Sequence, residues 1–329
     1  MTIDDPEALA ARVVAGEPAA VAEALNRVDD ARADRRESQL ALLDALEPRA
    51  RGARIGVTGA PGAGKSTLLD ALVSELRRRG RTVGILAVDP SSQRTGGALL
   101  GDRMRLGSIA RDAGVFLRSL AARDRLGGLS EATGPSLDVL AAAFDVVFVE
   151  TVGVGQSESE VTDLVDTLVF VAQPAAGDLI QFMKAGILEW PDVFFVNKSD
   201  LGELATRTAA ELRAGLELGA RRDATHRPPV LCGSGRDGIG IEALVDAIDA
   251  HRDHLARSGE GEARRRASRV ARVRRAIATE YGRQGLRMLQ GELAPETFVA
   301  ARDATSVARL VDALRSEIEV ALRRRFGGR

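Results

Sequence analysis

The stretch "RIGVTGAPGAGKSTLLDAL", residues 54–72, joins an apolar, strand-like run to a helical run through a glycine-rich loop. Its centre, from Gly59 to Ser66, fits the pattern G-x-x-x-x-G-K-S, and this strand–loop–helix setting predicts a phosphate-binding loop. Glycines let successive backbone N–H groups curl around a phosphate, and the start of the helix adds its positive end. The stretch therefore predicts an α/β nucleotide-binding fold.

The loop also carries its own candidate side chains. We expect Lys65 to reach the outer phosphates and Ser66 to bind magnesium. Only three of the 46 basic residues are lysines, Lys65, Lys184 and Lys198, which suggests positions where a compact ammonium is needed and a guanidinium does not fit. The residues expected to contact the nucleotide here are Gly59, Ala60, Pro61, Gly62, Ala63, Gly64, Lys65, Ser66 and Thr67.

A second motif indicates which base is bound. "NKSD", from Asn197 through Lys198 to Asp200, follows the apolar run "VFFV", at the edge of the sheet where ligands bind in open α/β folds. Asp200 can accept hydrogen bonds from N1–H and the amine of guanine, and such a site rejects an analogue lacking them by roughly 10⁴-fold. "CGSGRDGIG" predicts a second base-side loop, with Ser234 and Gly235 touching the purine. GTP and GDP are therefore favoured over ATP.

Three acidic residues are candidates for a magnesium site with Ser66. Asp89 and Glu150 end apolar runs, and Asp102 lies in "LLGDRMRL". Magnesium takes a few carboxylate or water oxygens beside those of phosphates, which suits this set. An ordinary loop or capping role is the alternative for any one of them, most of all for Asp102.

The pattern around these motifs predicts the architecture. From about residue 54 to 250, short apolar runs alternate with helical stretches, which is typical of a doubly wound, mostly parallel sheet covered on both faces. Helical spacing precedes this region and an arginine-rich helical tail follows it. We expect an N-terminal helical segment over 1–50, a P-loop GTPase domain over 51–250 and a C-terminal helical region over 251–329.

Composition narrows the class of protein. The chain has 329 residues, 45% of them hydrophobic and 28% charged, which favours a globular fold, and no apolar run reaches the roughly 18 residues of a membrane span. We expect a cytoplasmic protein with no membrane association. The basic tail has few aromatic residues for base stacking, so nucleic acid is not an expected partner. Cys232, His251 and His254 are too sparse for a convincing transition-metal site, and we interpret the two histidines as exposed on a helix face.

Several longer motifs resemble one known family. "VDPSSQRTGGALLGDRMRL", "LGGLSEAT", "FVETVGVGQSE", "DLVDT" and "QFMKAGILEWPDVFFVNKSD" occur in the order and spacing of the cobalamin-dependent mutase-associated GTPases. That family includes the methylmalonyl-CoA mutase chaperones and proteins formerly labelled arginine or ornithine transport-system kinases. The resemblance implies a GTPase that binds an adenosylcobalamin-dependent acyl-CoA mutase, gates cofactor loading and protects or reactivates the mutase. It also implies a homodimer held through the C-terminal helices.

The resemblance carries over to individual residues. Lys65, Ser66 and Thr67 match the phosphate loop, and the magnesium and switch acids are matched by Asp89, Asp102 and Glu150. Gly153 matches the glycine whose N–H meets the γ-phosphate. Residues 177–184, ending at Lys184, match a mobile third switch at the partner interface. Catalytic roles are thus expected for Lys65, Glu150, Asp102 and Lys184.

One departure bears on catalysis. Val154 stands where many nucleotide hydrolases keep a water-orienting glutamine, and its side chain can neither donate nor accept a hydrogen bond. We therefore expect slow hydrolysis by the protein alone, stimulated when a partner orders the switches. Gln156, Asp102 or Lys184 are the candidates that help to place water or charge.

Two alternatives stay open at this point. One is a nucleotide-dependent kinase linked to basic amino-acid transport, although no acceptor-directed base is evident apart from the magnesium acids. The other is a nickel-delivery maturation GTPase, whose only candidate ligands are the two histidines of "HRDH" and Cys232.

Overall fold

The computed structural model of the chain describes residues 5–30, 32–89, 112–121, 131–151, 157–174, 187–218 and 225–326. The strands are β1 (Ala53–Thr58), β2 (Val83–Asp89), β3 (Val115–Ala121), β4 (Val146–Glu150), β5 (Thr167–Ala172), β6 (Val193–Val196) and β7 (Val230–Cys232). The α-helices are α1 (Pro6–Val14), α2 (Pro18–Val28), α3 (Arg36–Leu46), α4 (Lys65–Arg78), α6 (Thr133–Ala143), α7 (Ser157–Thr162), α9 (Glu203–Leu218), α10 (Ile241–Ser258), α11 (Glu260–Met288), α12 (Pro295–Ala300) and α13 (Val307–Phe326). Short 3-10 helices span Ala33–Arg35, Glu47–Arg49, Ile187–Glu189, Ser199–Leu201 and Gly291–Leu293.

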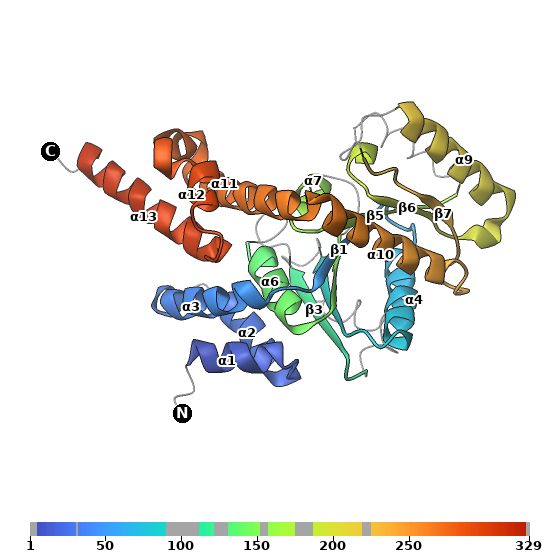
Figure 1. Cartoon of the computed structure of the whole chain (residues 1–329), viewed down its shortest axis with the longest axis horizontal. Coiled ribbons are helices and arrows are strands. Elements are labelled where there is room, and N and C mark those ends of the chain that lie inside the picture. The colour runs from blue at the N-terminus through green and yellow to red at the C-terminus, as the bar shows by residue number, and fades with distance from the viewer. Residues whose placement is uncertain are drawn as a thin grey trace. The chain divides into compact units, whose positions relative to one another are not determined.

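The seven strands form one sheet in the order β3-β2-β4-β1-β5-β6-β7, and every neighbouring pair is parallel. The predicted doubly wound α/β fold is confirmed (Figure 1). Parallel strands bring their carboxyl ends to one edge, so the loops after β1, β6 and β7 begin there, and Glu150 at the end of β4 lies there too. β1, which leads into the phosphate loop, lies between β4 and β5 in the interior of the sheet.

The two faces of the sheet are buried under different helices. Along β5 and β6, Val169 and Phe195 belong to the core that includes α4 and α10, whereas Phe170 and Phe194 belong to the core that includes α9. This alternation is the period of two expected of a strand that is covered on both sides. Burial on both faces explains why these strands read as continuous apolar runs in the sequence.

The chain divides into two compact units. Unit 1 consists of Met1–Arg51, Gly134–Ala143 and Glu262–Arg329, and unit 2 consists of Gly52–Thr133 and Phe144–Gly261. Unit 2 contains the sheet, and unit 1 is helical. The division of the chain into three domains at residues 50 and 250 stays a prediction. No helix in the described ranges is long and apolar enough to cross a membrane.

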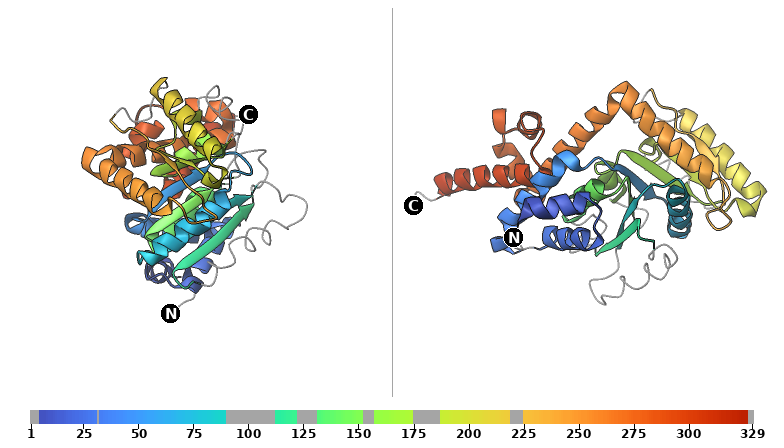
Figure 2. Two further views of the ribbon diagram at one scale, coloured as in Figure 1. Left: turned by 90° about the vertical axis from the view of Figure 1, so that its right-hand side faces the viewer. Right: turned by 60° about the horizontal axis from the view of Figure 1, so that its bottom comes forward.

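Unit 1 has its own hydrophobic core. Val273 and Ile277 of α11 pack with Phe298 of α12 and with Leu310 and Leu314 of α13. Figure 2 shows these three helices, coloured orange to red, gathered together. Helix α11 is interrupted at Gly282, which has φ of 62°. The arginine-rich tail is therefore a packed helical structure with an apolar interior.

Candidate nucleotide-binding site

The phosphate loop connects the end of β1 to the first residue of α4. Gly59 and Gly64 have φ of 142° and 87°, which favour glycine. A Cβ on Gly59 would lie 2.1 Å from the carbonyl oxygen of Val171, and a Cβ on Gly64 would lie 2.5 Å from Nδ2 of Asn197. Both glycines are therefore required by conformation and by the close approach of β5 and the "NKSD" motif.

Lys65 is the first residue of α4 and is almost completely buried, with 7% of its surface exposed. Its Nζ donates hydrogen bonds to the carbonyl oxygens of Gly59 and Ala60, at 2.9 and 3.1 Å. These contacts hold the ammonium over the loop whose N–H groups, together with the helix start, form an anion site. The arrangement is suited to binding the phosphates of a nucleotide.

Ser66 lies next to the acid that ends β4. Its Oγ donates a hydrogen bond of 2.8 Å to Oε1 of Glu150. The contact follows from the topology, because β4 pairs with β1 and α4 begins just beyond β1. A hydroxyl and a carboxylate are hard oxygen donors of the kind that Mg²⁺ takes beside phosphate oxygens. Ser66 and Glu150 therefore fit the predicted magnesium site.

Other predicted members of this site are only partly described. Asp89 ends β2, which pairs with β4, so its backbone lies at the expected edge of the sheet; its side chain is outside the description. Asp102, Gly153, Gln156 and Lys184 lie outside the described residues, as do Val154 and the segment 177–184. Their roles stay predictions.

Asn197 connects the two nucleotide loops. Its side chain, in a residue that is 3% exposed, donates from Nδ2 to the carbonyl oxygen of Ala63 at 2.9 Å. Its Oδ1 accepts a hydrogen bond of 2.9 Å from the backbone N–H of Gly235. One amide thus fixes the phosphate loop and the second base-side loop relative to each other. These hydrogen bonds are made within the protein, and they shape the site.

Lys198 reaches back to the phosphate loop. It is the only non-glycine residue with positive φ in the described ranges, at 58°, and strained residues of this kind cluster at functional sites. Its Nζ donates to the carbonyl oxygen of Gly62 at 2.7 Å and to Oε1 of Gln173 at 2.9 Å. The side chain of Lys198 therefore links the residues just after β6 to the phosphate loop, which follows β1.

Asp200 and the loop after β7 lie side by side. Arg236 places Nη2 3.2 Å from Oδ2 of Asp200, and it also contacts both carboxylate oxygens of Asp237. Ser234, 1% exposed, donates from Oγ to Asp237 at 2.7 Å. Hydrogen bonds from Arg236 and then Ser234 lower the pKa of the Asp237 carboxyl, while Asp237 and then Asp200 raise the pKa of the Arg236 guanidinium.

Gly235 lies close to α4 in the base-side loop. A Cβ at this position would lie 2.8 Å from Cα of Leu68 in α4. An alanine here would therefore press on the backbone of the phosphate-loop helix. Glycine lets the loop approach α4 closely enough for Gly235 N–H to reach Asn197.

Sequence reasoning missed three contributors to the site. Gln173 binds Lys198, and Arg236 contacts Asp200. Thr151, directly after Glu150, donates from Oγ1 to Oγ1 of Thr58 at 3.2 Å, and both hydroxyls are buried. The sequence did offer a signal at Gln173 and Thr151, because each is a polar residue that directly follows a strand at the edge where the site lies. The partner of Arg236 depends on which strands are neighbours, which no local pattern shows.

The histidines differ from the expectation. His251 is buried, 1% exposed, with Nδ1 2.8 Å from Oγ1 of Thr167 and Nε2 3.4 Å from Oδ1 of Asp192. The interpretation as exposed histidines is wrong, because α10 packs this position against the start of β5, and His254 is half-buried. Their rings cluster with that of His226, at centroid separations of 4.6 to 6.4 Å. In the described part of the chain, no group of histidine, cysteine and acidic residues has metal-holding geometry.

Comparison with known proteins adds independent evidence. The model of a family described as methylmalonyl-CoA mutase-associated GTPase MeaB matches residues 21–284. A probable GTPase of Mycobacterium bovis is 43% identical over 272 residues, covering 81% of each chain. The mouse protein named methylmalonic aciduria type A homolog, mitochondrial, is 37% identical over 268 residues, covering 77% of this chain and 64% of its own.

A solved structure is similar over nearly the full length. It is described as a LAO/AO transport system kinase and superposes with a TM-score of 0.69 at 26% identity. The alignment covers 97% of this chain and 99% of the other. The similarity therefore extends beyond the sheet to the flanking helices.

Proposed function

Because the chain belongs to the family of methylmalonyl-CoA mutase-associated GTPases, we propose that it is the chaperone of an adenosylcobalamin-dependent acyl-CoA mutase. The chain is a GTPase, like the relatives named so. In the proposed role, its nucleotide state gates loading of the cobalamin cofactor and protects or reactivates the mutase. The name of the mouse relative, which refers to methylmalonic aciduria, supports a partner that acts on methylmalonyl-CoA.

One observation carries the assignment of the site. Asn197 joins the phosphate loop at Ala63 to the base-side loop at Gly235, so the phosphate and base motifs form one continuous site. At one end of it lies Lys65, and at the other lies Asp200. This spacing of a phosphate anchor and a guanine-reading carboxylate supports GTP and GDP as the ligands.

The side chains take the following proposed roles. Lys65 contacts the outer phosphates, Asp200 accepts from the guanine edge, and Ser66 with Glu150 holds Mg²⁺. Asp89 and Asp102 complete the acids around the metal, and Gly153 donates its N–H to the γ-phosphate. Bound Mg²⁺ would neutralise negative charge that develops on the phosphate oxygens.

We propose that hydrolysis is slow without the mutase. Val154 offers no hydrogen bond to an attacking water, so Gln156, Asp102 or Lys184 must supply that help once a partner orders the switches. A homodimer built on the C-terminal helices and a cytoplasmic location complete the proposal.

The test is GTP turnover measured with and without a candidate cobalamin-dependent mutase. We expect free phosphate, slow release alone and faster release with the mutase, together with a complex whose stability differs between GDP and a non-hydrolysable GTP analogue. Unchanged turnover and absence of a complex with every such mutase would contradict the chaperone role. Labelled γ-phosphate that ends on protein or on a basic amino acid would instead support the kinase activity named for the similar solved structure.

Base recognition is tested separately. Asp200→Asn exchanges one acceptor for a donor, so it should lose GDP affinity by roughly 10⁴-fold and gain affinity for xanthosine diphosphate. A variant that kept its preference for guanine would exclude Asp200 as the residue that reads the base.

A further inference from the structure

Arg236 occupies an unusual position in the loop after β7. The loop is closed by backbone hydrogen bonds between Ser234 and Ile239, at 2.9 and 3.1 Å, and Gly233 accepts from the N–H of Ser199 beside Asp200. The loop is therefore fixed against the "NKSD" motif. The residue that it presents toward Asp200 is an arginine.

The guanidinium of Arg236 is oriented before it meets Asp200. Its Nε lies 3.0 Å from Oδ1 of Asp237 and its Nη2 lies 3.1 Å from Oδ2. Asp237 is itself held by Ser234 Oγ and donates its own N–H to that hydroxyl. A bidentate pair of this kind sets the plane of the guanidinium. Asp237 therefore aims Arg236, and the orientation does not depend on Asp200.

From this orientation Nη2 also reaches Asp200, 3.2 Å from Oδ2. The Asp200 side chain is 30% exposed and that of Arg236 is 69% exposed. The pair is thus open to solvent and easily separated, since exposed ion pairs are weak and sensitive to salt.

Guanine and Arg236 would both present N–H groups to Asp200. Guanine presents N1–H and an exocyclic amine on one carbon, which is the donor pattern of a guanidine group. Arg236 uses Nε and Nη2 for Asp237, so toward Asp200 it presents Nη2 alone, together with its positive charge. In the proposed site, guanine and Arg236 therefore require the same carboxylate.

We propose that Arg236 is an internal competitor of the guanine base for Asp200. Its guanidinium pairs with the carboxylate until the guanine edge replaces it, and Asp237 keeps it close by for the reverse exchange. Arg236 thereby sets how fast guanine nucleotides enter the site. The inference rests on the proposed role of Asp200 in reading guanine and extends it to the regulation of nucleotide exchange.

The first test is the association of fluorescently labelled GDP in stopped flow. Arg236→Ala should associate about two- to fivefold faster at low salt, the size expected for loss of one exposed ion pair, with an unchanged dissociation rate. Arg236→Lys keeps the charge without the planar fork and should also be faster. The difference from wild type should shrink at high salt.

Arg207→Ala is the matched control for the loss of one positive charge. Arg207 lies on α9, is 80% exposed and pairs with Glu211 one turn away, so its variant also loses one exposed positive charge and one ion pair but keeps Arg236 beside Asp200. Its variant should associate with labelled GDP at the wild-type rate.

A double-mutant cycle with Asp200→Asn shows whether Arg236 slows nucleotide association through Asp200. In that background, with labelled xanthosine diphosphate as the probe, Arg236→Ala should leave the association rate unchanged. A rate increase that persists there would overturn the proposal. So would wild-type association in Arg236→Ala, or faster dissociation, which would mean that Arg236 holds the bound base.

Failure of the proposed function is recognisable in the same data. If wild type binds no guanine nucleotide, or if Asp200→Asn keeps its preference for guanine, the role of Asp200 is wrong whatever Arg236 does. If those two results are as expected but the Arg236 variants do not associate faster than wild type, the role of Asp200 in reading guanine is supported and the proposed competition by Arg236 is wrong.

Discussion

At the scale of single residues, the site depends on the size of a few residues as much as on charge. Lys65 is enclosed by carbonyl oxygens of the loop it serves, and Gly235 is pressed against the backbone of α4. A Cβ at Gly235 would lie 2.8 Å from Cα of Leu68, so this position has no room for a side chain.

Lys65→Ala should lower GTP turnover on the order of 10²- to 10³-fold, because in its proposed role Lys65 supplies a preorganised charge to the phosphates. Lys65→Arg should not restore it, since a planar guanidinium does not fit a site where the lysine is 7% exposed. Phosphate release at saturating GTP measures the effect, with thermal unfolding as the control for folding. Turnover near the wild-type value in either variant would remove Lys65 from the catalytic set.

Gly235→Ala should lower GDP affinity several-fold and stability by about 1–3 kcal/mol, because its Cβ forces the loop away from Leu68. Gly80→Ala is the control, since it has φ of 78° but no atom within 4 Å of the added Cβ. That variant carries backbone strain alone and should keep wild-type GDP affinity. Equal affinities of the two variants in a binding titration would contradict the steric explanation.

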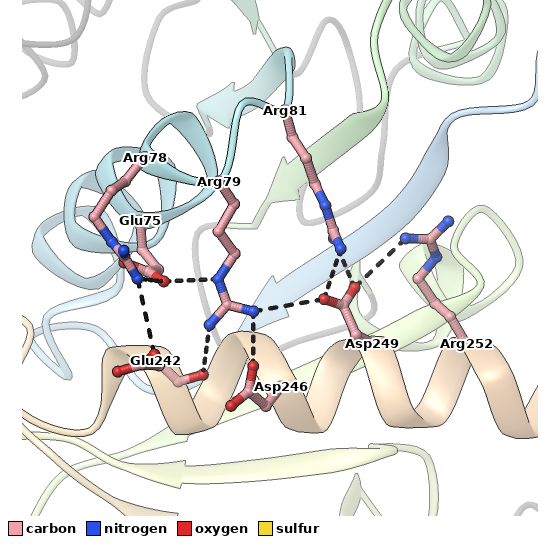
Figure 3. Close-up of polar contacts among 8 residues, drawn as sticks. All are labelled: Glu75, Arg78, Arg79, Arg81, Glu242, Asp246, Asp249 and Arg252. Atoms are coloured by element: carbon pink, nitrogen blue, oxygen red, sulfur yellow. Dashed lines mark hydrogen bonds and ion pairs between the residues drawn. The ribbon is translucent and has the colours of Figure 1, made fainter.

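At the scale of elements, α4 and α10 pack together, and each begins at one of the two loops of the proposed nucleotide site. Helix α4 begins at the phosphate loop and α10 begins just after the base-side loop, and their apolar faces share one core. A charge network links the end of α4 to α10 (Figure 3). Arg79 binds Glu75 within α4 and Asp246 on α10, and Arg81 binds Asp249. The network therefore adds polar contacts between two helices that already share an apolar core.

Arg81 and Asp249 should be coupled by about 0.5–1 kcal/mol in a double-mutant cycle, the upper part of the range for solvent-accessible pairs. The pair is bidentate, at 2.6 and 2.8 Å, and its side chains are 32% and 24% exposed. Arg207 and Glu211 provide the reference, because they are more exposed and should couple by no more than about 0.3–0.5 kcal/mol. Urea unfolding of the alanine variants gives both values, and a smaller value for Arg81–Asp249 would contradict the prediction.

Glu75 should make stability depend on pH in the acid range. Hydrogen bonds from Arg78 and then Arg79 lower the pKa of its carboxyl from 4.5 to about 2. A carboxyl with a depressed pKa stabilises the fold fully above its unfolded value, and that contribution is lost as pH falls from 4.5 toward 2.

The comparison is between wild type and Glu75→Gln, which cannot ionise. Wild type should have the higher unfolding temperature at about pH 6, and the difference should narrow toward about pH 3. A difference that stays constant over this range would show that the charge on Glu75 does not stabilise the fold.

At the scale of the whole molecule, unit 1 is built from three segments distant in sequence. Arg309 of α13 binds Asp44 of α3 at 2.8 Å, and Arg36 of α3 binds Asp312 of α13 at 2.9 Å. The third segment, α6, contacts the C-terminal segment, because Arg272 of α11 pairs with Asp138 of α6. Unit 1 therefore combines helices from three parts of the chain through ion pairs between them.

The Arg272–Asp138 pair should be critical for this unit. The side chains are 9% and 7% exposed, Nη2 lies 2.6 Å from Oδ2, and a Cβ on Gly134 would touch the same guanidinium. Burial lowers the pKa of Arg272, but the charge of Asp138 and its hydrogen bond outweigh burial, so the net pKa is raised. Arg272→Met leaves a buried carboxylate without its counter-charge and should cost about 3–5 kcal/mol in unfolding free energy.

Arg272→Met combined with Asp138→Leu is the control. Removing both charges should recover much of the loss, because an apolar pair of similar volume is often as stable as a buried ion pair. Chemical unfolding followed by circular dichroism measures both variants. A double variant as unstable as Arg272→Met would mean that packing, and not the unpaired charge, is responsible.

The amino-acid sequence was sufficient for everything that depends on local order. Glycine spacing identified the phosphate loop, apolar runs identified the strands, and the family motifs identified the class of GTPase, because each is a property of neighbouring residues. Glu150 beside Ser66 was within reach of the same reasoning, since both follow strands whose carboxyl ends share an edge.

Contacts between distant segments were decided by packing alone. The sequence shows helices before residue 50 and after residue 251, but the joining of both with α6 in one unit depends on which apolar faces and buried charges complement each other. His251 looked exposed because helical spacing does not reveal what lies opposite a side chain. Arg236 reaches Asp200 because the strand order places β7 beside β6, and a strand order is a property of the folded chain.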